Sequence, residues 1–380
     1  MNSVPFRPPI GSVRSIVVKV GSRILASPES PDHDRRLKNL VGDLVAMHTA
    51  GIRVLLVTSG AIAHGVRALR LPRRPRTMPL KQACASVGQI RLMHLYESLF
   101  AQHGVTIGQV LLTWDDLRDK KRYVNLRNTL FQLLDRSVIP ILNENDSVGV
   151  EEIRFGDNDT LGAHAAMLAG ADLLVILTDT PGLFDANPRT TKGRHIPLVE
   201  RITAAVHAYA EEKGSAQGVG GMVTKLKAAE MVTKAGIFAI IGDGFHGRLL
   251  DAVRDETAGT LFLPSKKRMS SRQRWLAFSG RVRGALSVDE GARRALCRKG
   301  TSLLPAGIRS ITGAFNAGDM VEITDESGHA FARGKVSYSS ADIEKILGCR
   351  TGEIAERIGR KTSDEVIHRD NLVLLGTGEN

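Results

Sequence analysis

Three consecutive polar residues, Asp157, Asn158 and Asp159, follow Gly156 where an apolar helical pattern begins near Leu161. An Asp or Asn at the start of a helix accepts a hydrogen bond from a free backbone N–H group, and this role accounts for one of the three. The other two, at the start of a helix that reads as buried, indicate a binding or catalytic site.

Two lysines stand where an ammonium group could meet an anion. Lys19 lies in the apolar stretch 15–21, just before Gly21, and Lys225 follows the glycine-rich stretch 218–221 at the start of an amphipathic helical pattern. An unpaired lysine is costly to bury, whereas glycine turns and helix N-termini present backbone N–H groups to phosphates. The alternatives are a solvent-reaching lysine at the edge of a sheet, for residue 19, and a flexible linker, for the glycine-rich stretch.

These features favour phosphoryl transfer. That chemistry needs positioned reactants and neutralised charge rather than a nucleophile paired with a base. Asp157, Asp159 and Asp179 are available to hold a metal ion or the lysines. The three cysteines are widely spaced and form no metal-binding pattern. Single histidines on predicted helices are expected to be surface or packing residues: His64, His94 and His103.

The chain up to residue 263 alternates short β-branched runs with helical patterns, which predicts a three-layer αβα sandwich around a mainly parallel sheet. The predicted strands are 15–21, 52–60, 138–146, 171–179 and 237–244. The predicted helices lie near 34–50, 81–103, 119–136, 158–169 and 223–235. Ligands of such sheets bind at the carboxyl ends of the strands. The polar turns there are expected to converge: Gly21-Ser22, Thr58-Ser59-Gly60, Asn143 to Asp146, Thr178-Asp179 and Gly242 to Gly244.

The alternation of strand-like and helical patterns ends after residues 1–263, the predicted first domain, and this change predicts a second domain. Residues 264–283 hold seven Lys or Arg and no acid and read as a basic linker. Residues 284–362 read as a small β-rich domain and 363–380 as a C-terminal tail. Within the small domain, the sequence predicts a strand turning into a short helix from 284, and then two strands joined by a turn near Gly328.

The bulk composition of the 380 residues, with 42% hydrophobic and 24% charged residues, is that of a soluble globular protein. The start of the chain has no signal-peptide core, and no run approaches the roughly 18 apolar residues of a membrane span. Sparse cysteines favour a reducing compartment, so a cytoplasmic protein is expected. The formal charge of +12 favours a solvated basic surface, with attraction to nucleic acid as the alternative.

The order of "VVKVGS", "VTSGAIAHG", "PILNENDSV", "FGDNDTLGAHAAMLAGAD", "LTDTPGLFDANPR" and "GVGGMVTKLKAA" resembles that of glutamate 5-kinases, members of the amino acid kinase family. The likeness covers nearly the whole chain, because the C-terminal module resembles the PUA domain that many bacterial glutamate 5-kinases carry. The motifs "NEND", "GDND" and "GGMVTK" are specific in this order, whereas a glycine pair alone is not.

The resemblance implies ATP-dependent phosphorylation of the γ-carboxylate of L-glutamate, giving L-glutamyl 5-phosphate in the first step of proline synthesis. By motif, Lys19 and Lys225 match lysines that bind ATP and stabilise the transferring phosphoryl group, and Asp159 matches an acid that holds these lysines. Mg²⁺ is expected to be carried mainly by the phosphates of ATP, so no residue is assigned as a metal ligand.

The other predicted site residues also follow from the resemblance. Ser59, Asp146 and Asn158 match glutamate contacts, and Asp146 can pair with the α-amino group that acetylglutamate lacks. The predicted nucleotide site consists of Lys19, Thr178, Asp179, Val219, Gly220, Gly221, Met222, Val223, Thr224 and Lys225.

The resemblance further implies proline as a feedback inhibitor, a homodimer or homotetramer, and functional coupling to glutamyl phosphate reductase. Two alternatives stay open. One is an RNA-binding or RNA-regulated protein, although the 13 basic and 14 acidic residues from 284 to 380 argue against RNA binding there. The other is a family member with another acceptor: acetylglutamate, aspartate, carbamate or a nucleoside monophosphate.

Overall fold

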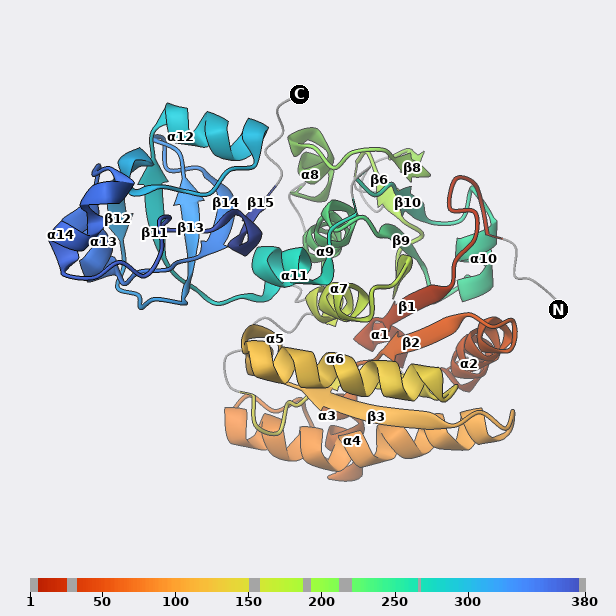
Figure 1. The fold of residues 1–380 in the computed structure, drawn as a ribbon. Helices are drawn as coiled ribbons and strands as arrows, with labels where there is room; N and C mark the ends of the chain where they lie inside the picture. Colours follow the sequence, from red (N-terminus) through yellow and green to blue (C-terminus); the bar gives the residue numbers. More distant parts are fainter. Residues whose placement is uncertain are drawn as a thin grey trace. The chain divides into compact units, whose positions relative to one another are not determined.

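The computed structural model describes residues 6–25, 33–149, 158–186, 193–211, 221–265 and 268–375. The chain forms two compact units: Met1–Leu117 with Lys121–Arg268, and Met269–Asn380 with Arg118–Lys120. Each unit has its own sheet and hydrophobic core (Figure 1). Within the described ranges, no helix combines the length and the apolar character that crossing a membrane requires.

The first unit is built on an eight-stranded sheet with the order β3-β4-β2-β1-β5-β9-β10-β8. Every neighbouring pair is parallel except β9 and β10, which confirms the predicted mainly parallel sheet. The strands are β1 (Ser15–Val20), β2 (Arg53–Val57), β3 (Ile107–Leu112), β4 (Ile139–Glu144), β5 (Leu173–Thr178), β8 (Leu198–Val199), β9 (Phe238–Asp243) and β10 (Thr260–Phe262), and a separate hairpin pairs β6 (Leu183–Phe184) with β7 (His195–Ile196).

Five of these strands, β1, β2, β4, β5 and β9, confirm predicted ones. Strand β3 was not predicted, because it lies at an edge of the sheet and is only partly buried. A partly buried strand does not require a continuous β-branched run, and the sequence of β3, IGQVLL, includes Gly108 and Gln109. The strand pattern is therefore weak.

Helices cover both faces of the sheet, as the sandwich requires. They are α1 (Ser22–Leu25), α2 (His33–Thr49), α3 (Ala61–Ala68), α4 (Met78–Ala101), α5 (Trp114–Arg118), α6 (Lys120–Asp135), α7 (Asn158–Ala169), α8 (Ala204–Glu211), α9 (Met222–Lys234) and α10 (Leu249–Arg254). All five predicted helices are confirmed, with ends shifted by at most a few residues.

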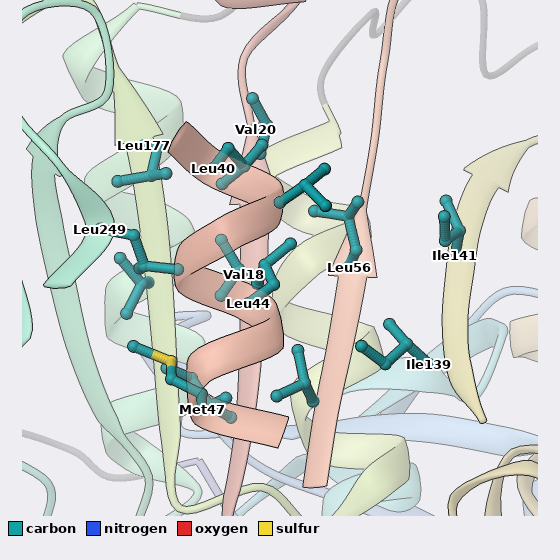
Figure 2. Packing of buried hydrophobic residues seen from close by; sticks show 14 of the residues in the cluster. Val18, Val20, Leu40, Leu44, Met47, Leu56, Ile139, Ile141, Leu177 and Leu249 are labelled. Carbon is teal, nitrogen blue, oxygen red and sulfur yellow. The ribbon is translucent and has the colours of Figure 1, made fainter. Parts of the chain in front are cut away.

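Strand β1 shows how the packing positions a charged residue. Leu44 and Met47 of α2 pack against the β1 face that carries Val18 and Val20 (Figure 2). Because side chains alternate along a strand, Lys19 points to the opposite face of the sheet. There it meets α7, which packs on β1.

The second unit holds a five-stranded sheet with the order β12-β11-β13-β14-β15. The strands are β11 (Val282–Val288), β12 (Ile308–Thr312), β13 (Met320–Thr324), β14 (Ala330–Lys335) and β15 (Leu372–Leu374), and the helices are α11 (Ser271–Arg274), α12 (Glu290–Arg294), α13 (Ser340–Ile346) and α14 (Ile354–Ile358). The predicted strand and helix from residue 284 and the predicted hairpin are confirmed. The predicted basic linker, 264–283, contains helix α11. The predicted C-terminal tail, 363–380, contains strand β15, which pairs with β14.

Two glycines let α3 and α4 approach each other closely. A Cβ atom added to Gly88 of α4 would lie 1.7 Å from the carbonyl oxygen of Ala61 in α3. A Cβ atom added to Gly65 of α3 would lie 1.8 Å from the carbonyl oxygen of Cys84 in α4. Since the opposing atoms belong to the backbone, they cannot rotate away as a side chain could.

Gly88→Ala is therefore expected to lower the free energy of unfolding by about 3 kcal/mol, the upper end of the usual cost of overpacking. Gly42→Ala is the matched control, because Gly42 lies within α2 and a Cβ atom there meets nothing within 4 Å. That change should stabilise the protein by about 0.5–1 kcal/mol. Urea unfolding of both variants measures the difference, and equal midpoints would contradict the close approach of the two helices.

Candidate functional site

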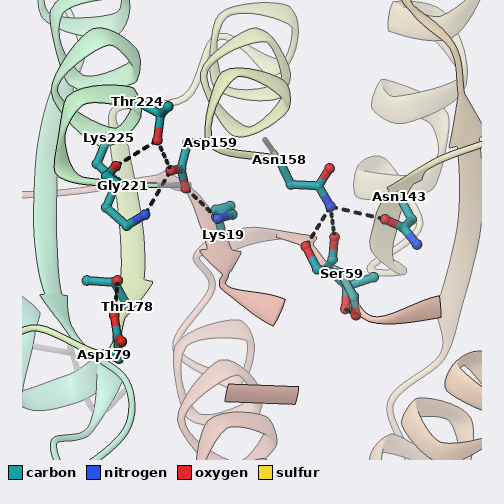
Figure 3. Close-up of polar contacts among 11 residues, drawn as sticks. Lys19, Ser59, Asn143, Asn158, Asp159, Thr178, Asp179, Gly221, Thr224 and Lys225 are labelled. Carbon is teal, nitrogen blue, oxygen red and sulfur yellow. Dashed lines mark hydrogen bonds and ion pairs between the residues drawn. The ribbon is translucent and has the colours of Figure 1, made fainter. Parts of the chain in front are cut away.

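A buried carboxylate, that of Asp159, joins two lysines from distant parts of the chain (Figure 3). Its side chain is fully buried; Lys19 donates to Oδ1, and the Nζ atom of Lys225 lies 3.0 Å from Oδ2. Lys19 and Lys225 are themselves only 4% and 5% exposed. The structure thus brings all three predicted catalytic residues into one ion cluster.

The fold positions each member of this cluster. Lys19 lies near the carboxyl end of β1, and Lys225 lies in the first turn of α9, next to α7. Asp159 lies in the first turn of α7, where the helix dipole favours a negative charge. Gly162, one turn further along α7, leaves room for the lysine stem, because a Cβ atom there would lie 3.2 Å from Cβ of Lys19.

Thr224 adds a third contact to the same carboxylate. Its hydroxyl oxygen lies 3.0 Å from Oδ2 of Asp159 and 2.8 Å from the carbonyl oxygen of Gly221. The hydroxyl has one proton, which the two acceptors share, so the side chain helps to hold Asp159 in place. Its backbone N–H group also lies 3.2 Å from the carbonyl oxygen of Gly221, so the predicted contact between Thr224 and ATP stays a prediction.

A second polar cluster starts one residue earlier in the chain. Nδ2 of Asn158 lies 2.6 Å from Oγ of Ser59, 2.6 Å from the carbonyl oxygen of Thr58 and 3.3 Å from Oδ1 of Asn143. Nδ2 of Asn143 in turn donates to Oε1 of Gln89 at 2.8 Å. The turn after β2 and the carboxyl end of β4 therefore converge on the start of α7, as expected for strand carboxyl ends.

Three residues of this second cluster were not predicted from the sequence as site residues. Asn143 lies inside the quoted "NEND" motif, which is a signal that could have identified it. Gln89 and Tyr96 lie in the middle of α4, and Tyr96 shares a 2.9 Å hydrogen bond with Thr58. No local pattern separates such residues from ordinary helix residues.

Apart from Lys19 on β1, the predicted nucleotide residues that the structure describes lie at the end of β5 and at the start of α9. Thr178 and Asp179 follow one another at the end of β5, and the Thr178 hydroxyl donates to Asp179 at 3.2 Å. The backbone N–H of Gly244 donates to the carbonyl oxygen of Thr178 at 2.8 Å, which joins the turn after β9 to that after β5. Gly221, Met222 and Val223 lie at the start of α9, whereas Asp157, Val219 and Gly220 lie outside the described residues.

Asp146 lies in the turn after β4 and is half-buried. Burial raises the pKa of its carboxyl group to about 6. No hydrogen bond from the described part of the chain offsets this loss of water. Such a carboxylate can gain from an ammonium group brought by a ligand.

The arrangement suits a polyanionic ligand beside a small polar one. Two ammonium groups share one carboxylate, which leaves a net positive charge to meet phosphate oxygens. The neighbouring cluster offers neutral donors and acceptors. The oxygens of Asp159 are engaged by Lys19, Lys225 and Thr224. Among the described residues there is no group of three His, Cys, Asp or Glu that could hold a metal ion.

Comparisons with known proteins agree with this geometry. Residues 14–243 match the amino acid kinase family, and residues 284–358 match the PUA domain. A glutamate 5-kinase from Moorella thermoacetica is 47% identical over 369 residues, covering 97% of this chain and 98% of that protein. Glutamate 5-kinases from Syntrophotalea carbinolica (47% over 367 residues) and Geobacter sulfurreducens (44% over 368 residues) each cover 96% of this chain and at least 98% of their own length.

Asp159→Asn is expected to lower the free energy of unfolding by about 3–5 kcal/mol, because it removes the negative charge that the two buried ammonium groups share. Thr224→Val, which removes only a neutral donor to the same carboxylate, should cost about 1–2 kcal/mol. Urea titrations of the two variants beside the wild type provide the measurement. Equal losses would mean that the charge of Asp159 does not hold the cluster together.

Proposed function

The chain belongs to the amino acid kinase family and, within it, to the glutamate 5-kinases, and we propose that the two polar clusters form the two halves of its active site. The reaction is the ATP-dependent phosphorylation of the γ-carboxylate of L-glutamate, the first step of proline synthesis. In the proposal, Lys19 and Lys225 bind the phosphates of ATP, and Ser59, Asp146 and Asn158 bind glutamate.

The convergence of Lys19 and Lys225 on Asp159, next to Asn158 in the chain, is the observation that supports the proposal most directly. Both substrates are anions, so the attacking carboxylate approaches the γ-phosphate only where positive charge offsets the repulsion. The two ammonium groups supply that charge without a nucleophile on the enzyme. Asp159 keeps them on the side of the site where the phosphates would lie.

Mg²⁺ enters the proposal with the nucleotide. The carboxylate oxygens of Asp159 are engaged by lysine and threonine donors, which fits a metal ion held mainly by the phosphate oxygens of ATP. When bound there, Mg²⁺ neutralises further phosphate charge. The nucleotide itself is assigned to Thr178, Asp179 and the start of α9.

Further parts of the proposal rest on the resemblance to glutamate 5-kinases alone. These are inhibition by proline, a homodimer or homotetramer, coupling to glutamyl phosphate reductase and a cytoplasmic location. The names of the relatives favour glutamate over the other acceptors considered. No observation on the second unit favours RNA binding as the main function.

Lys225→Ala is expected to reduce glutamate-dependent ADP release by at least about a thousandfold, since it removes one of two cations from the transferring group. Hydroxylamine trapping of the labile acyl phosphate, with Mg²⁺ and ATP present, measures the product. Lys227→Ala is the matched control, because this lysine lies on the same helix and is exposed. A wild-type enzyme that releases ADP equally well without glutamate would contradict the proposed function.

The pH dependence should follow the carboxyl group of Asp146. Its pKa of about 6 means that the group is largely ionised above pH 6 and neutral below. Only the ionised form attracts the α-ammonium group of glutamate. We therefore expect kcat/KM for glutamate to fall about tenfold per pH unit below the pKa of this group. Asp146→Asn should give a low and flat profile between pH 5 and pH 7, and an unchanged acid limb in this variant would assign the pKa to another group.

A further inference from the structure

We propose that Gln89, on helix α4, is a positioning residue that orients Asn143 and so supports the orientation in which Asn158 and Ser59 face the amino acid substrate. Its side chain lies behind the second polar cluster and holds Asn143, which in turn contacts Asn158. The inference rests on the proposed function for the identity of the substrate. The hydrogen-bond geometry that carries it is independent of that identity.

The directions of the hydrogen bonds in this cluster agree with two acceptors, Oε1 of Gln89 and the carbonyl oxygen of Thr58. Its Oε1 accepts from Nδ2 of Asn143, so Oδ1 of Asn143 is the end that faces Asn158. An amide has one donor end and one acceptor end. Asn158 accordingly turns its Nδ2 toward Asn143, where the same nitrogen also meets Oγ of Ser59 and the carbonyl oxygen of Thr58.

This orientation decides what the substrate meets. With Nδ2 of Asn158 turned inward, its Oδ1 is the end left for a ligand, and it can only accept. Oγ of Ser59 accepts from Asn158, so the hydroxyl proton is available to a ligand oxygen. Together with Asp146, the pocket then offers acceptors to an ammonium group and a donor to a carboxylate, which is the pattern of a free α-amino acid.

The opposite orientation would be unfavourable for the same ligand. If Asn143 turned over, its Nδ2 would face Nδ2 of Asn158, and two donors would oppose each other. Asn158 could not relieve this clash by turning over, because its Oδ1 would then face the carbonyl oxygen of Thr58. Gln89 opposes this arrangement, because its Oε1 accepts from Nδ2 of Asn143.

Helix α4 holds Gln89 firmly enough for this role. Its side chain is 8% exposed, and the preceding Gly88 packs against the backbone of Ala61. Two turns along the same helix, Tyr96 hydrogen-bonds Thr58, whose carbonyl oxygen also accepts from Asn158. One helix thus fixes the second cluster at two points.

The state of the amide nitrogen of Gln89 helps to distinguish a positioning role of this residue from a role in stabilising the fold. Within the described part of the chain, Nε2 is buried without a hydrogen-bond partner. A buried donor without a partner is destabilising, so an apolar residue of similar shape would serve the fold about equally well. The acceptor on Oε1 is what such a residue would lose.

The test compares Gln89→Met, which keeps the length but loses the acceptor, with Gln89→Glu, which keeps an oxygen for Asn143 in either protonation state. Ser86→Ala, at an exposed position one turn earlier on α4, is the control. Initial rates of hydroxamate formation give kcat and KM for each substrate, and urea titration gives the unfolding midpoint. NMR of asparagine-labelled protein follows hydrogen exchange of the Asn143 side-chain amide.

For Gln89→Met we expect KM for glutamate to rise about tenfold, the effect of one lost buried hydrogen bond, with KM for ATP and the unfolding midpoint little changed. Amide exchange at Asn143 should accelerate, and Gln89→Glu should restore both values toward wild type. Equal rises of both KM values, or unchanged exchange at Asn143, would overturn the inference. Wild-type protein that forms no hydroxamate with glutamate would instead refute the proposed function, while the exchange data would still decide the role of Gln89.

Discussion

A carboxylate withdrawn completely from water, that of Asp159, is the constraint on which the rest of the structure depends. Such a group is stable only when hydrogen bonds and opposite charges replace the lost water. Here two ammonium groups and a hydroxyl do so, and they come from β1 and from the start of α9. The requirement places β1 under α7 and α9 beside α7. Without the carboxylate at this position, burying Lys19 and Lys225 together would be unfavourable, because the two positive charges repel each other.

Much of this arrangement could be predicted because it follows from strand ends. The buried strands β1, β2, β4, β5 and β9 carry strong apolar patterns, and the edge at which parallel strands end is set by their common direction. Lys19 stood out because a charge in an apolar strand needs a partner. The identity of that partner, Asp159, came only from the resemblance to a family, since no pattern joins residues that are 140 positions apart.

The rest could not be predicted because it depends on how closely elements approach. Gln89 and Tyr96 belong to the second cluster only because α4 packs tightly on α3, and that distance is set by Gly65 and Gly88. In the sequence these are ordinary residues of a helix. Strand β3 escaped for a related reason, since an edge strand needs burial on fewer sides and shows a weaker pattern.

Under the proposed function, the adjacency of Asn158 and Asp159 would let one helix start serve two substrates. Consecutive residues on a helix point in directions about 100° apart. The amide therefore reaches toward the turns after β2 and β4, while the carboxylate reaches toward Lys19 and α9 (Figure 3). A neutral cluster suits a zwitterion, whose two charges need opposite partners, whereas a cationic cluster suits a polyphosphate. Because the two side chains share one backbone turn, covalent geometry fixes the spacing between the two residues on which the clusters are centred, while packing brings their partners to them.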